Sequence, residues 1–404
     1  MTASRVLVLN SGSSSVKYQL LDMADRSRLA AGLVERIGEE TSRLVHEPLT
    51  GSGAAGGRRE RLGPIADHGA ALEAVAAELA ADGLGLDSPE LAAVGHRVVH
   101  GGTRFTQPTV IDDEVLAEIR SLIPLAPLHN PANVTGIEVA RSLRADIPQV
   151  AVFDTAFHST MPEYAARYAI DAATADKYAI RRYGFHGTSH AYVSRATAAL
   201  LGRAPSDVNV IVLHLGNGAS ASAVRGGVCV ETSMGMTPLE GLVMGTRSGD
   251  LDPAVVFHLA RAGGLSVDEI DSLLNKKSGL LGLCGDNDMR EVQRRAEEGD
   301  ASAQLALASY VHRLKKYIGA YSAVLGRVDA VAFTAGVGEN SSWIRKAAVE
   351  GLAELGLALD LEANAARSPE PRLVSAECAR VAVAVVPTDE ELEIASQAYA
   401  LVTR

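Results

Sequence analysis

The sequence predicts an α/β protein with two domains that share a related core. The chain has 404 residues, too many for one hydrophobic core, and its hydrophobic share of 47% is typical of packed globular proteins. Short β-branched strands alternate with helical segments rich in Ala and Leu. A unit of strand, Gly- and Ser-rich turn and strand occurs near the start of each half. This recurrence predicts two related halves with a cleft between them.

The first half begins with a predicted β-hairpin. Strands at residues 5–10 and 16–21 flank the turn sequence Asn-Ser-Gly-Ser-Ser-Ser. Residues 50–69 are rich in Gly, Ala and Arg without periodicity, which predicts a surface loop or mobile insertion. The other predicted elements are a helix at 70–81, a strand at 92–99, helices at 112–122 and 133–143, and a strand at 149–153 that delivers Asp154.

The second half repeats this pattern. Strands are predicted at 208–215, 219–224 and 228–230, separated by the turns Gly216-Asn217-Gly218 and Arg225-Gly226-Gly227. The later elements are a long helix at 301–325, a strand at 330–333 followed by the start of a helix, a strand at 381–386, and a helix from about Asp389.

The composition excludes several classes of function. A net charge of −11 is wrong for a protein that binds nucleic-acid phosphates, and 1 Trp, 10 Tyr and 6 Phe leave few platforms for stacking bases. Apolar runs such as 381–386 are too short to span a membrane, and the run at 6–9 is too short for a signal peptide. Three widely spaced cysteines are typical of reduced thiols. We therefore expect a soluble cytoplasmic enzyme that binds neither nucleic acid nor a membrane.

Three Gly-rich segments are candidates for binding phosphate. Residues 12–17, G-S-S-S-V-K, lack the second Gly of a Walker A loop, yet backbone amides, hydroxyls and Lys17 could hold a phosphate there. Residues 216–221 match G-x-G-x-x-A but precede a strand, so we reject a dinucleotide fingerprint and keep a phosphate hairpin. Residues 336–340 follow a strand and open a helix, which favours an anion or nucleotide site. An ordinary hairpin or close packing is the alternative in each case.

The histidines and arginines add a second set of candidates. His96 with His100 and His186 with His190 are each four residues apart, which allows core histidines, donors to an anion or, less well, zinc. Arg97 lies in an apolar strand, where a guanidinium needs an anionic partner. Arg247 lies in the loop Gly-Thr-Arg-Ser-Gly, where a ligand can approach the backbone, although a structural salt bridge would explain either arginine.

The start of the last helix and the end of the strand at 149–153 carry acidic candidates. Thr388 and Glu391 match a capping box, which would leave Glu390 able to reach a metal-bound water. Asp154 lies where ligands of open sheets bind, or it could cap the turn at Thr155.

Taken together, these segments resemble the acetate kinase family. The stretches that carry the resemblance cover essentially the whole chain in family order, and they are NSGSSSVK, GHRVVHGG, PLAPLHNP, VFDTAFHSTMP, RRYGFHGTSH, HLGNGAS, TSMGMTPLEGLVMGTRSGDLDP, FTAGVGEN and PTDEELEIA. The two long stretches RRYGFHGTSH and TSMGMTPLEGLVMGTRSGDLDP are highly specific, whereas no single Gly loop would be.

The resemblance implies two duplicated actin-like (ribonuclease H-like) domains with a nucleotide cleft between them. Residues 1–153 and 387–404 would form the N-terminal domain, on the acetate and magnesium side. Residues 154–386 would form the C-terminal domain, on the nucleotide side. The family is typically homodimeric, which we expect here as well.

The reaction implied is the reversible in-line transfer of the γ-phosphoryl group of ATP to acetate, giving ADP and acetyl phosphate, with Mg²⁺, which Mn²⁺ can replace. Acetate is already a deprotonated nucleophile, so the chemistry needs cationic positioning groups more than a base. By resemblance, Arg97 and Arg247 position acetate and the phosphoryl group, His186 donates to the transferring group, and His129 assists. Asp154 is the family's catalytic acid, which we expect to orient an arginine or the metal.

Further contacts follow from the resemblance alone. Asn10 and Glu390 would hold Mg²⁺, partly through water. The pocket for the acetate methyl group would consist of Val99, Leu128, Phe185 and Pro238. ATP would contact Lys17, His214, Leu215, Gly216, Asn217, Gly218, Asp288, Met289, Arg290, Gly336, Val337, Gly338, Glu339 and Asn340.

Two departures from the family pattern and three alternative functions remain open. Cys284 stands where Ser is usual, with one residue fewer before Asp288, a departure that concerns the contacts to the nucleotide base and not the chemistry. Asp389 stands where Asn is usual, and the extra acid could alter metal affinity. The alternatives are a propionate or butyrate kinase of the same family, a nucleotide-gated actin- or chaperone-like ATPase, and, more remotely, a zinc hydrolase.

Overall fold

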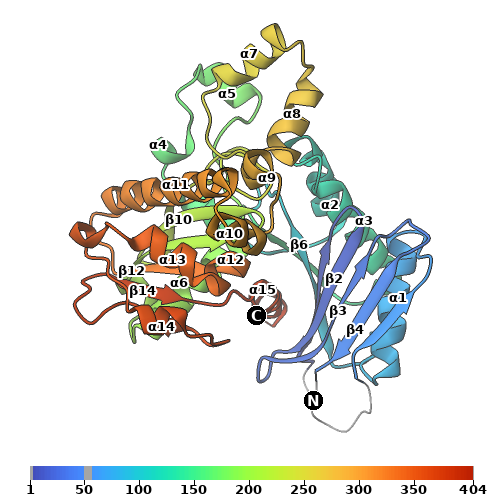
Figure 1. Cartoon of the computed structure of the whole chain (residues 1–404). Helices are drawn as coiled ribbons and strands as arrows, with labels where there is room; N and C mark the ends of the chain where they lie inside the picture. The colour runs from blue at the N-terminus through green and yellow to red at the C-terminus, as the bar shows by residue number, and fades with distance from the viewer. Residues whose placement is uncertain (1–2, 50–56, 404) are drawn as a thin grey trace. The chain divides into compact units, whose positions relative to one another are not determined.

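The chain forms two compact units, each of which is described by itself (Figure 1). The computed structural model describes residues 3–49 and 57–403. Unit 1 comprises the described residues up to Ala156 and from Asp389 onward. Unit 2 runs from Phe157 to Thr388. The chain therefore leaves unit 1 once and returns to it for its last helix.

Within the described residues, unit 1 is built on an eight-stranded mixed sheet with the strand order β5-β4-β3-β2-β1-β6-β8-β7. Strands β1 to β5 form an antiparallel meander, and β1, β6 and β8 are parallel. The strands are β1 (Arg5–Ser11), β2 (Ser15–Asp22), β3 (Ser27–Glu35), β4 (Arg43–Pro48), β5 (Arg59–Leu62), β6 (Leu91–Val98), β7 (Thr109–Val110) and β8 (Gln149–Phe153). The helices are α1 (His68–Ala81), α2 (Asp113–Ser121), α3 (Asn130–Leu143) and α15 (Glu390–Val402).

Alternation along β1 buries both faces of this sheet. Leu7 and Leu9 pack in the cluster that contains buried residues of α1 and α3. Val6 and Val8 pack in the cluster that contains Ile394, Ala395 and Ala398 of α15. A Cβ on Gly95 of β6 would lie 3.0 Å from the Ile394 side chain, so glycine allows α15 to lie close to the strand. The C-terminal helix is therefore part of the core of unit 1.

Unit 2 repeats the central part of this architecture. Its described strands form a six-stranded sheet in the order β11-β10-β9-β12-β14-β13. The series β11-β10-β9-β12-β14 matches β3-β2-β1-β6-β8 in order and direction, because β9 pairs antiparallel with β10 and parallel with β12. The strands are β9 (Asn209–Leu215), β10 (Ala219–Arg225), β11 (Val228–Thr232), β12 (Ala330–Thr334), β13 (Arg372–Leu373) and β14 (Ala382–Val385). The predicted α/β class and duplicated cores are confirmed.

Helices complete unit 2. Helix α6 packs Val193 and Ala198 in a buried cluster with Val210 and Val212 of β9 and with residues of β12 and β14. Helix α11 has the bounds predicted from periodicity and buries Leu307, Leu314 and Ile318 along one side. The helices are α4 (Glu163–Ala166), α5 (Ala172–Lys177), α6 (Gly187–Leu200), α7 (Ala254–Ala262), α8 (Val267–Lys276), α9 (Gly279–Cys284), α10 (Met289–Glu297), α11 (Ala301–Leu325), α12 (Ala335–Asn340), α13 (Ser342–Val349) and α14 (Leu361–Ala365).

Two sequence predictions about local structure are wrong. The loop predicted at 50–69 contains β5, which pairs antiparallel with β4, and α1 already begins at His68; residues 50–56 of this prediction lie outside the described residues. The capping box of Thr388 and Glu391 does not form, because the N-cap of α15 is Asp389, whose side chain accepts from the Leu392 N–H. Glu391 instead pairs with Lys17.

Within the part of the chain that the structure describes, we find no helix that is both long and apolar enough to cross a membrane.

Candidate active site

A buried ion pair lies at the ends of two neighbouring parallel strands of unit 1. Arg97 Nε and Nη2 donate to Asp154, with Nε 3.0 and 3.1 Å from the two carboxylate oxygens and Nη2 2.6 Å from Oδ2. Asp154 directly follows β8, and its N–H donates to the carbonyl of Val98 on β6. Both Asp154 oxygens therefore face Arg97, so the alternative cap at Thr155 does not form.

Burial opposes the charges of this pair, and each partner favours the charge of the other; for Asp154 burial outweighs Arg97, so the net pKa of the carboxyl is raised. The Asp154 side chain is 1% exposed, and its burial raises the pKa of the carboxyl, whereas Arg97 lowers it. Burial opposes the charge on Arg97, but Asp154 and Glu390 outweigh it, so the pKa of the guanidinium lies above its ordinary value. The Arg97 side chain keeps 21% of its surface exposed, which leaves it able to meet an anion.

Helix α3 fixes the loop that follows Arg97. Asn133 Oδ1 accepts from the Val99 N–H, and Asn130 Oδ1 accepts from the His100 N–H. His129 stands at the N-cap of α3 without a side-chain capping bond, and Leu128 beside it is 53% exposed. Sequence reasoning missed both asparagines, although they lie within or beside the quoted stretch PLAPLHNP.

The hairpin and the last helix of unit 1 carry the predicted phosphate and metal residues. Asn10 lies opposite Lys17 across the β1–β2 hairpin. Lys17 Nζ lies 2.5 Å from the carboxylate of Glu391, so its charge is already compensated. Asp389, the departure from the family pattern, is held by Arg28 at 2.6 Å while it caps α15.

In unit 2, His186 stands at the N-cap of α6 with its side chain turned toward the sheet. Its φ of +58° lies in the left-handed region, which is uncommon for a residue other than glycine. His186 Nδ1 lies 2.9 Å from Ser220 Oγ on β10. Its ring stacks on that of His214, with centroids 4.2 Å apart and planes 20° apart. The ring of His186 is therefore fixed in both position and plane.

Arg247 lies beside His186. A Cβ built on Gly218 would lie 3.5 Å from Arg247 Nη1 and 3.6 Å from His186 Nε2, so glycine leaves space next to both groups. Arg247 Nη1 donates to the carbonyl of Pro238 at 3.3 Å. No carboxylate of the described residues forms an ion pair with Arg247, and burial lowers its pKa. A partly buried guanidinium without a counterion is suited to an anionic ligand.

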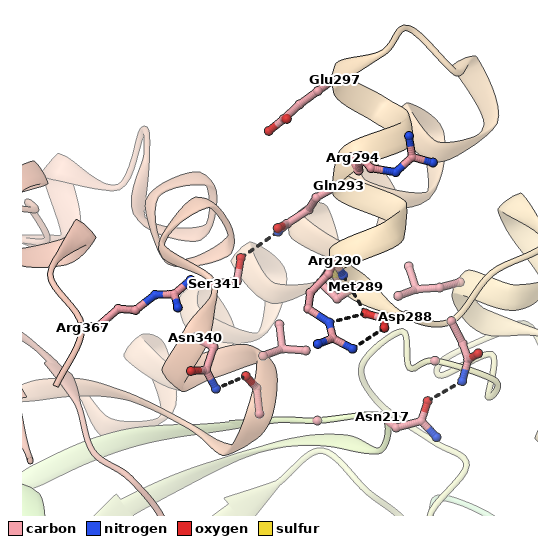
Figure 2. A pocket seen from close by; sticks show the side chains of 16 residues that line it. Asn217, Asp288, Met289, Arg290, Gln293, Arg294, Glu297, Asn340, Ser341 and Arg367 are labelled. Atoms are coloured by element: carbon pink, nitrogen blue, oxygen red, sulfur yellow. Dashed lines mark hydrogen bonds and ion pairs between the residues drawn. The ribbon is translucent and has the colours of Figure 1, made fainter. Parts of the chain in front are cut away.

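A cavity of about 940 Å³ is lined by most of the residues predicted to contact the nucleotide (Figure 2). Its walls include the turn after β9, the start of α10, helix α12 and Arg367. Figure 2 shows Arg290 turned back onto Asp288, with Nε and Nη2 at 3.0 and 2.6 Å from its oxygens. Asn287 donates to Asn217 at 3.0 Å and links the two loops. The predicted residues that line the cavity are Gly216, Asn217, Asp288, Met289, Arg290, Gly336, Val337 and Asn340.

Other residues predicted to contact ATP do not line this cavity. Lys17 belongs to unit 1, Leu215 is fully buried, His214 stacks on His186, and Gly218 faces Arg247. Glu339 Oε1 accepts from the N–H of Ala335 and from that of Thr388, so the start of α12 is already occupied by a carboxylate. The start of α12 is thus no open anion site, although Gly336 and Val337 still line the cavity.

Sequence reasoning missed half of the cavity wall. The missed residues are Gly245, Leu280, Asn287, Gln293, Arg294, Glu297, Ser341 and Arg367. Gly245 was signalled by the loop that holds Arg247, and the N–H of Gly245 donates to the Asn217 carbonyl at 2.8 Å. The sequence of α10 indicates only a charged surface helix and not a ligand site, because Arg294 pairs with Glu291 and Glu298 on the surface.

Among the residues with described positions, no three His, Cys, Asp or Glu side chains are grouped so that they could hold a metal ion. His96 bonds to Gln149 at 2.8 Å, whereas His100 lies beyond the end of β6, whose bounds differ by one residue from the strand predicted at 92–99. His186 and His190 both contact Ser220. The two histidine pairs therefore serve hydrogen bonding.

Comparisons with known proteins agree on one family. The chain matches the Acetokinase family over residues 5–396. It is 76% identical over 402 residues to the acetate kinase of Streptomyces avermitilis, covering 100% of this chain and 98% of that protein. Its fold is similar to the crystal structure of Porphyromonas gingivalis acetate kinase, with a TM-score of 0.92 and 44% identity over 100% of both chains. A propionate kinase from Francisella tularensis matches with a TM-score of 0.90 and 42% identity over 98% of both chains.

Proposed function

The chain belongs to the acetokinase family, and on that premise we propose how its residues share the transfer of a phosphoryl group from ATP to acetate. The reaction is that of the family's acetate kinases, an ATP:acetate phosphotransfer. We propose that residues 1–153 and 387–404 supply the acetate and metal side and that residues 154–386 supply the nucleotide side. The observation that carries the assignment is that Arg97 pairs with Asp154, whereas Arg247 forms no ion pair with any carboxylate of the described residues.

Arg97 holds the acetate carboxylate in this proposal. Its guanidinium is oriented by Asp154, which uses both oxygens to fix it, and the exposed part of Arg97 can offer its remaining N–H donors to acetate. Asp154 is then a positioning residue, because acetate needs no base to become a nucleophile. This agrees with the burial of Asp154 behind the arginine.

Arg247 and His186 stabilise the transferring phosphoryl group. Negative charge spreads over the three equatorial oxygens in the transition state, and preorganised donors stabilise it there. Arg247 supplies a cation that has no counterion among the described residues, and His186 supplies an N–H from the same place beside Gly218. His129, at the start of α3, assists from the acetate side.

The cavity of unit 2 receives the nucleotide. Its volume falls within the range of small-ligand sites, and its wall carries Arg367 beside Arg290 and Arg294, which are both ion-paired with carboxylates. The remaining residues predicted to contact ATP do not line the cavity. In this proposal they either support the structure around it or bind the phosphates, and they are Lys17, His214, Leu215, Gly218, Gly338 and Glu339. Lys17 would have to exchange its bond with Glu391 for one to a phosphate.

Asn10 and Glu390 are the proposed magnesium ligands. An amide oxygen and a carboxylate are the hard oxygen donors that Mg²⁺ prefers, with water completing the coordination, and Mn²⁺ accepts the same donors. When bound, the ion neutralises charge on the β- and γ-phosphate oxygens. Glu390 interacts electrostatically with Arg97 and Asp154, which supports its place near the carboxylate-binding group.

The acyl group is bounded in this proposal by Val99, Leu128, Phe185 and Pro238. The similarity to a propionate kinase makes propionate, and more weakly butyrate, a second candidate acceptor. One methylene in an apolar pocket is worth only about 1–3 kcal/mol, so a chain-length series of carboxylates measures this preference directly.

The test of the function is acyl hydroxamate formation from ATP, acetate and hydroxylamine. We expect hydroxamate that requires a divalent ion and is lost when EDTA is added. ATP turnover that is independent of any carboxylate would instead favour an actin- or chaperone-like ATPase. Metal analysis of the purified protein that found stoichiometric zinc would favour a hydrolase.

A homodimer and a cytoplasmic location are further proposals. Large apolar side chains are exposed on α4, α7 and α8 of unit 2, and Tyr164, Phe257 and Val267 are 85%, 56% and 80% exposed. Exposed apolar residues of this size support the proposal that a second copy of the chain covers this surface. Sedimentation equilibrium at several concentrations distinguishes a dimer from a monomer.

A further inference from the structure

A line of buried polar side chains runs from the interior of unit 2 to His186. Ser220 and Ser222 are alternate residues of β10, so both side chains point to the same face of the sheet, and both are fully buried. His186 and His190 are one helical turn apart at the start of α6 and face those serines. The two spacings match, so that each histidine meets a serine.

The contacts form a continuous chain. Ser222 Oγ lies 2.7 Å from His190 Nδ1, and His190 Nε2 lies 2.7 Å from Ser220 Oγ. Ser220 Oγ lies 2.9 Å from His186 Nδ1. Each hydroxyl has one proton to donate, so the direction of one bond fixes the direction of the next.

The Ser222 end of this series of hydrogen bonds determines the direction in which all of them are donated. Burial lowers the pKa of His190 well below its ordinary value, with His158 and His214 adding to the effect, so His190 is neutral with one N–H. If that proton were on Nδ1, Ser222 would accept it, and the Ser222 hydroxyl would have no acceptor among the described residues. A buried hydroxyl without an acceptor is costly. With the proton on Nε2, Ser222 donates to Nδ1 and every proton of the chain has an acceptor.

The remaining bonds then follow in order. His190 Nε2–H donates to Ser220, Ser220 donates to His186 Nδ1, and the His186 proton must be on Nε2. The Nε2 edge of His186 is the one that lies beside Gly218 and Arg247. The opposite direction would turn a lone pair, not an N–H, toward an incoming phosphoryl group.

We propose that Ser222, His190 and Ser220 form a directional hydrogen-bond chain that holds His186 in the Nε2–H tautomer, the form that donates to the transferring phosphoryl group. Ser220 and His190 are positioning residues in this scheme, since they act only through His186. The inference rests on the proposed function for the role of His186, but the tautomer itself is a property of the protein without substrate. The stacking of His214 on His186 fixes the ring plane and does not by itself select a tautomer.

The direct test is the side-chain ¹⁵N spectrum of histidine-labelled protein without nucleotide. His186 and His190 should each show a protonated Nε2 and an unprotonated Nδ1. In Ser220→Ala, the His186 signals should move toward a mixture of both tautomers. A protonated Nδ1 on His186 in the unaltered protein, or an unchanged His186 spectrum in Ser220→Ala, would overturn the proposal.

Kinetics give a second, independent readout. Ser220→Ala should lower kcat by about 10- to 100-fold, less than the roughly 100- to 1,000-fold effect of losing a preorganised donor outright, because part of the His186 population keeps the Nε2–H form. The KM values of ATP and acetate should stay nearly unchanged. In a His186→Ala background the same substitution should have no further effect, because its action passes through that ring. An equal loss in both backgrounds would mean a general structural role and would refute the chain.

Two more variants complete the design. Ser194→Ala removes the hydroxyl of another buried serine of unit 2, one that donates only to the Ala191 carbonyl, and it should change neither the rate nor the His186 spectrum. If Ser220→Ala fails to fold, Ser222→Ala releases the far end of the chain and should produce the same mixture of tautomers. A normal tautomer pattern together with a fully active His186→Ala variant would support the chain while refuting the catalytic role of His186.

Discussion

Arg97 and Asp154 are joined by three hydrogen bonds between one guanidinium and both oxygens of one carboxylate. The carboxylate is almost completely buried, and the guanidinium is partly exposed. In this arrangement the aspartate orients the guanidinium, and the exposed part of the arginine is available to bind an anion. A proton acceptor would need an oxygen turned toward the substrate.

Replacement of Asp154 by Asn should therefore lower kcat/KM for acetate by about 100-fold, because a small misplacement of a positioning group has effects of that size. The pH–rate profile should keep its shape, since the carboxylate takes no proton in the reaction. Steady-state rates across pH are the measurement. Asp146→Asn, which removes an exposed ion pair of the same unit, is the matched control. Loss of the acidic limb of the profile in Asp154→Asn would contradict the positioning role.

Arg247→Met should separate activity from stability. The substitution removes a partly buried cation that has no described carboxylate partner, so we expect phosphoryl transfer to fall by about 1,000-fold or more. The free energy of unfolding should stay the same or rise by about 1 kcal/mol, because functional sites often carry such unfavourable groups. Urea unfolding and initial rates measure the two effects, and phosphate or pyrophosphate should raise the Tm of the unaltered protein only. A stability loss like that of a core mutant would show that Arg247 is structural.

Gly336→Ala should affect the nucleotide and leave the fold intact. A Cβ at Gly336 would meet nothing within 4 Å, yet Gly336 lines the cavity, so the added methyl group takes space only from a ligand. We expect the KM for ATP to rise by about tenfold, the equivalent of about 1.4 kcal/mol, with the KM for acetate unchanged. Gly319→Ala, which also meets nothing but lies in α11 outside the cavity wall, is the control. Equal effects of both substitutions would place the nucleotide elsewhere.

Acid should destabilise the protein through its buried histidines. Burial lowers the pKa of His96 and of His158 to about 4, from an unfolded value of 6.5. Between about pH 4 and 6.5 the unfolded chain binds protons that the folded chain excludes, so the free energy of unfolding falls as the pH is lowered. His96→Gln should reduce this slope by up to about 1.4 kcal/mol per pH unit, as measured by urea unfolding at several pH values. The exposed His258→Gln controls for the substitution itself, and an unchanged slope in His96→Gln would refute the assignment.

Asp389→Asn should leave magnesium affinity unchanged. The Asp389 carboxylate is bound by Arg28 and by the Leu392 N–H, so it is not available to a metal ion in this arrangement. Asparagine caps helices as well as aspartate does, and the lost pair with half-exposed Arg28 should lower stability by less than about 1 kcal/mol. Titration of activity with Mg²⁺ checks the first statement. A marked shift in the magnesium requirement would mean that Asp389, and not only Glu390, serves the ion.

The elements predicted from the sequence are those whose signal is local. The periodicity of α11 predicts its bounds, and the alternation around the turn at 10–15 predicts the β1–β2 hairpin. Strands β3 and β4 are not predicted: residues such as Leu29, Ala30 and Glu35 of β3 favour helices and form a strand by pairing with β2, and β4 in turn pairs with β3. Strand β5 follows for the same reason, since it exists through its pairing with β4.

The candidate site divides in the same way. Arg97 and Arg247 stand out in the sequence because a cation in an apolar strand or a Gly-flanked loop contradicts its surroundings. The difference between the two arginines cannot be read from the sequence. Only in the folded chain does Asp154 pair with Arg97, while no carboxylate of the described residues pairs with Arg247. Ser220 lies in the segment predicted as a phosphate hairpin and Ser222 in a predicted strand, and the link of these serines to two histidines depends on the docking of α6.

The return of the chain to unit 1 has a consequence for its biosynthesis. Helix α15 covers the face of the first sheet formed by Val6, Val8 and Val152, yet a ribosome makes this helix only after all of unit 2. All residues of the second unit are made before this helix, whereas the apolar face of the first sheet stays exposed until the helix has been made. This face is therefore the apolar surface of the first unit that stays uncovered longest during synthesis, and exposed surface of this kind favours aggregation.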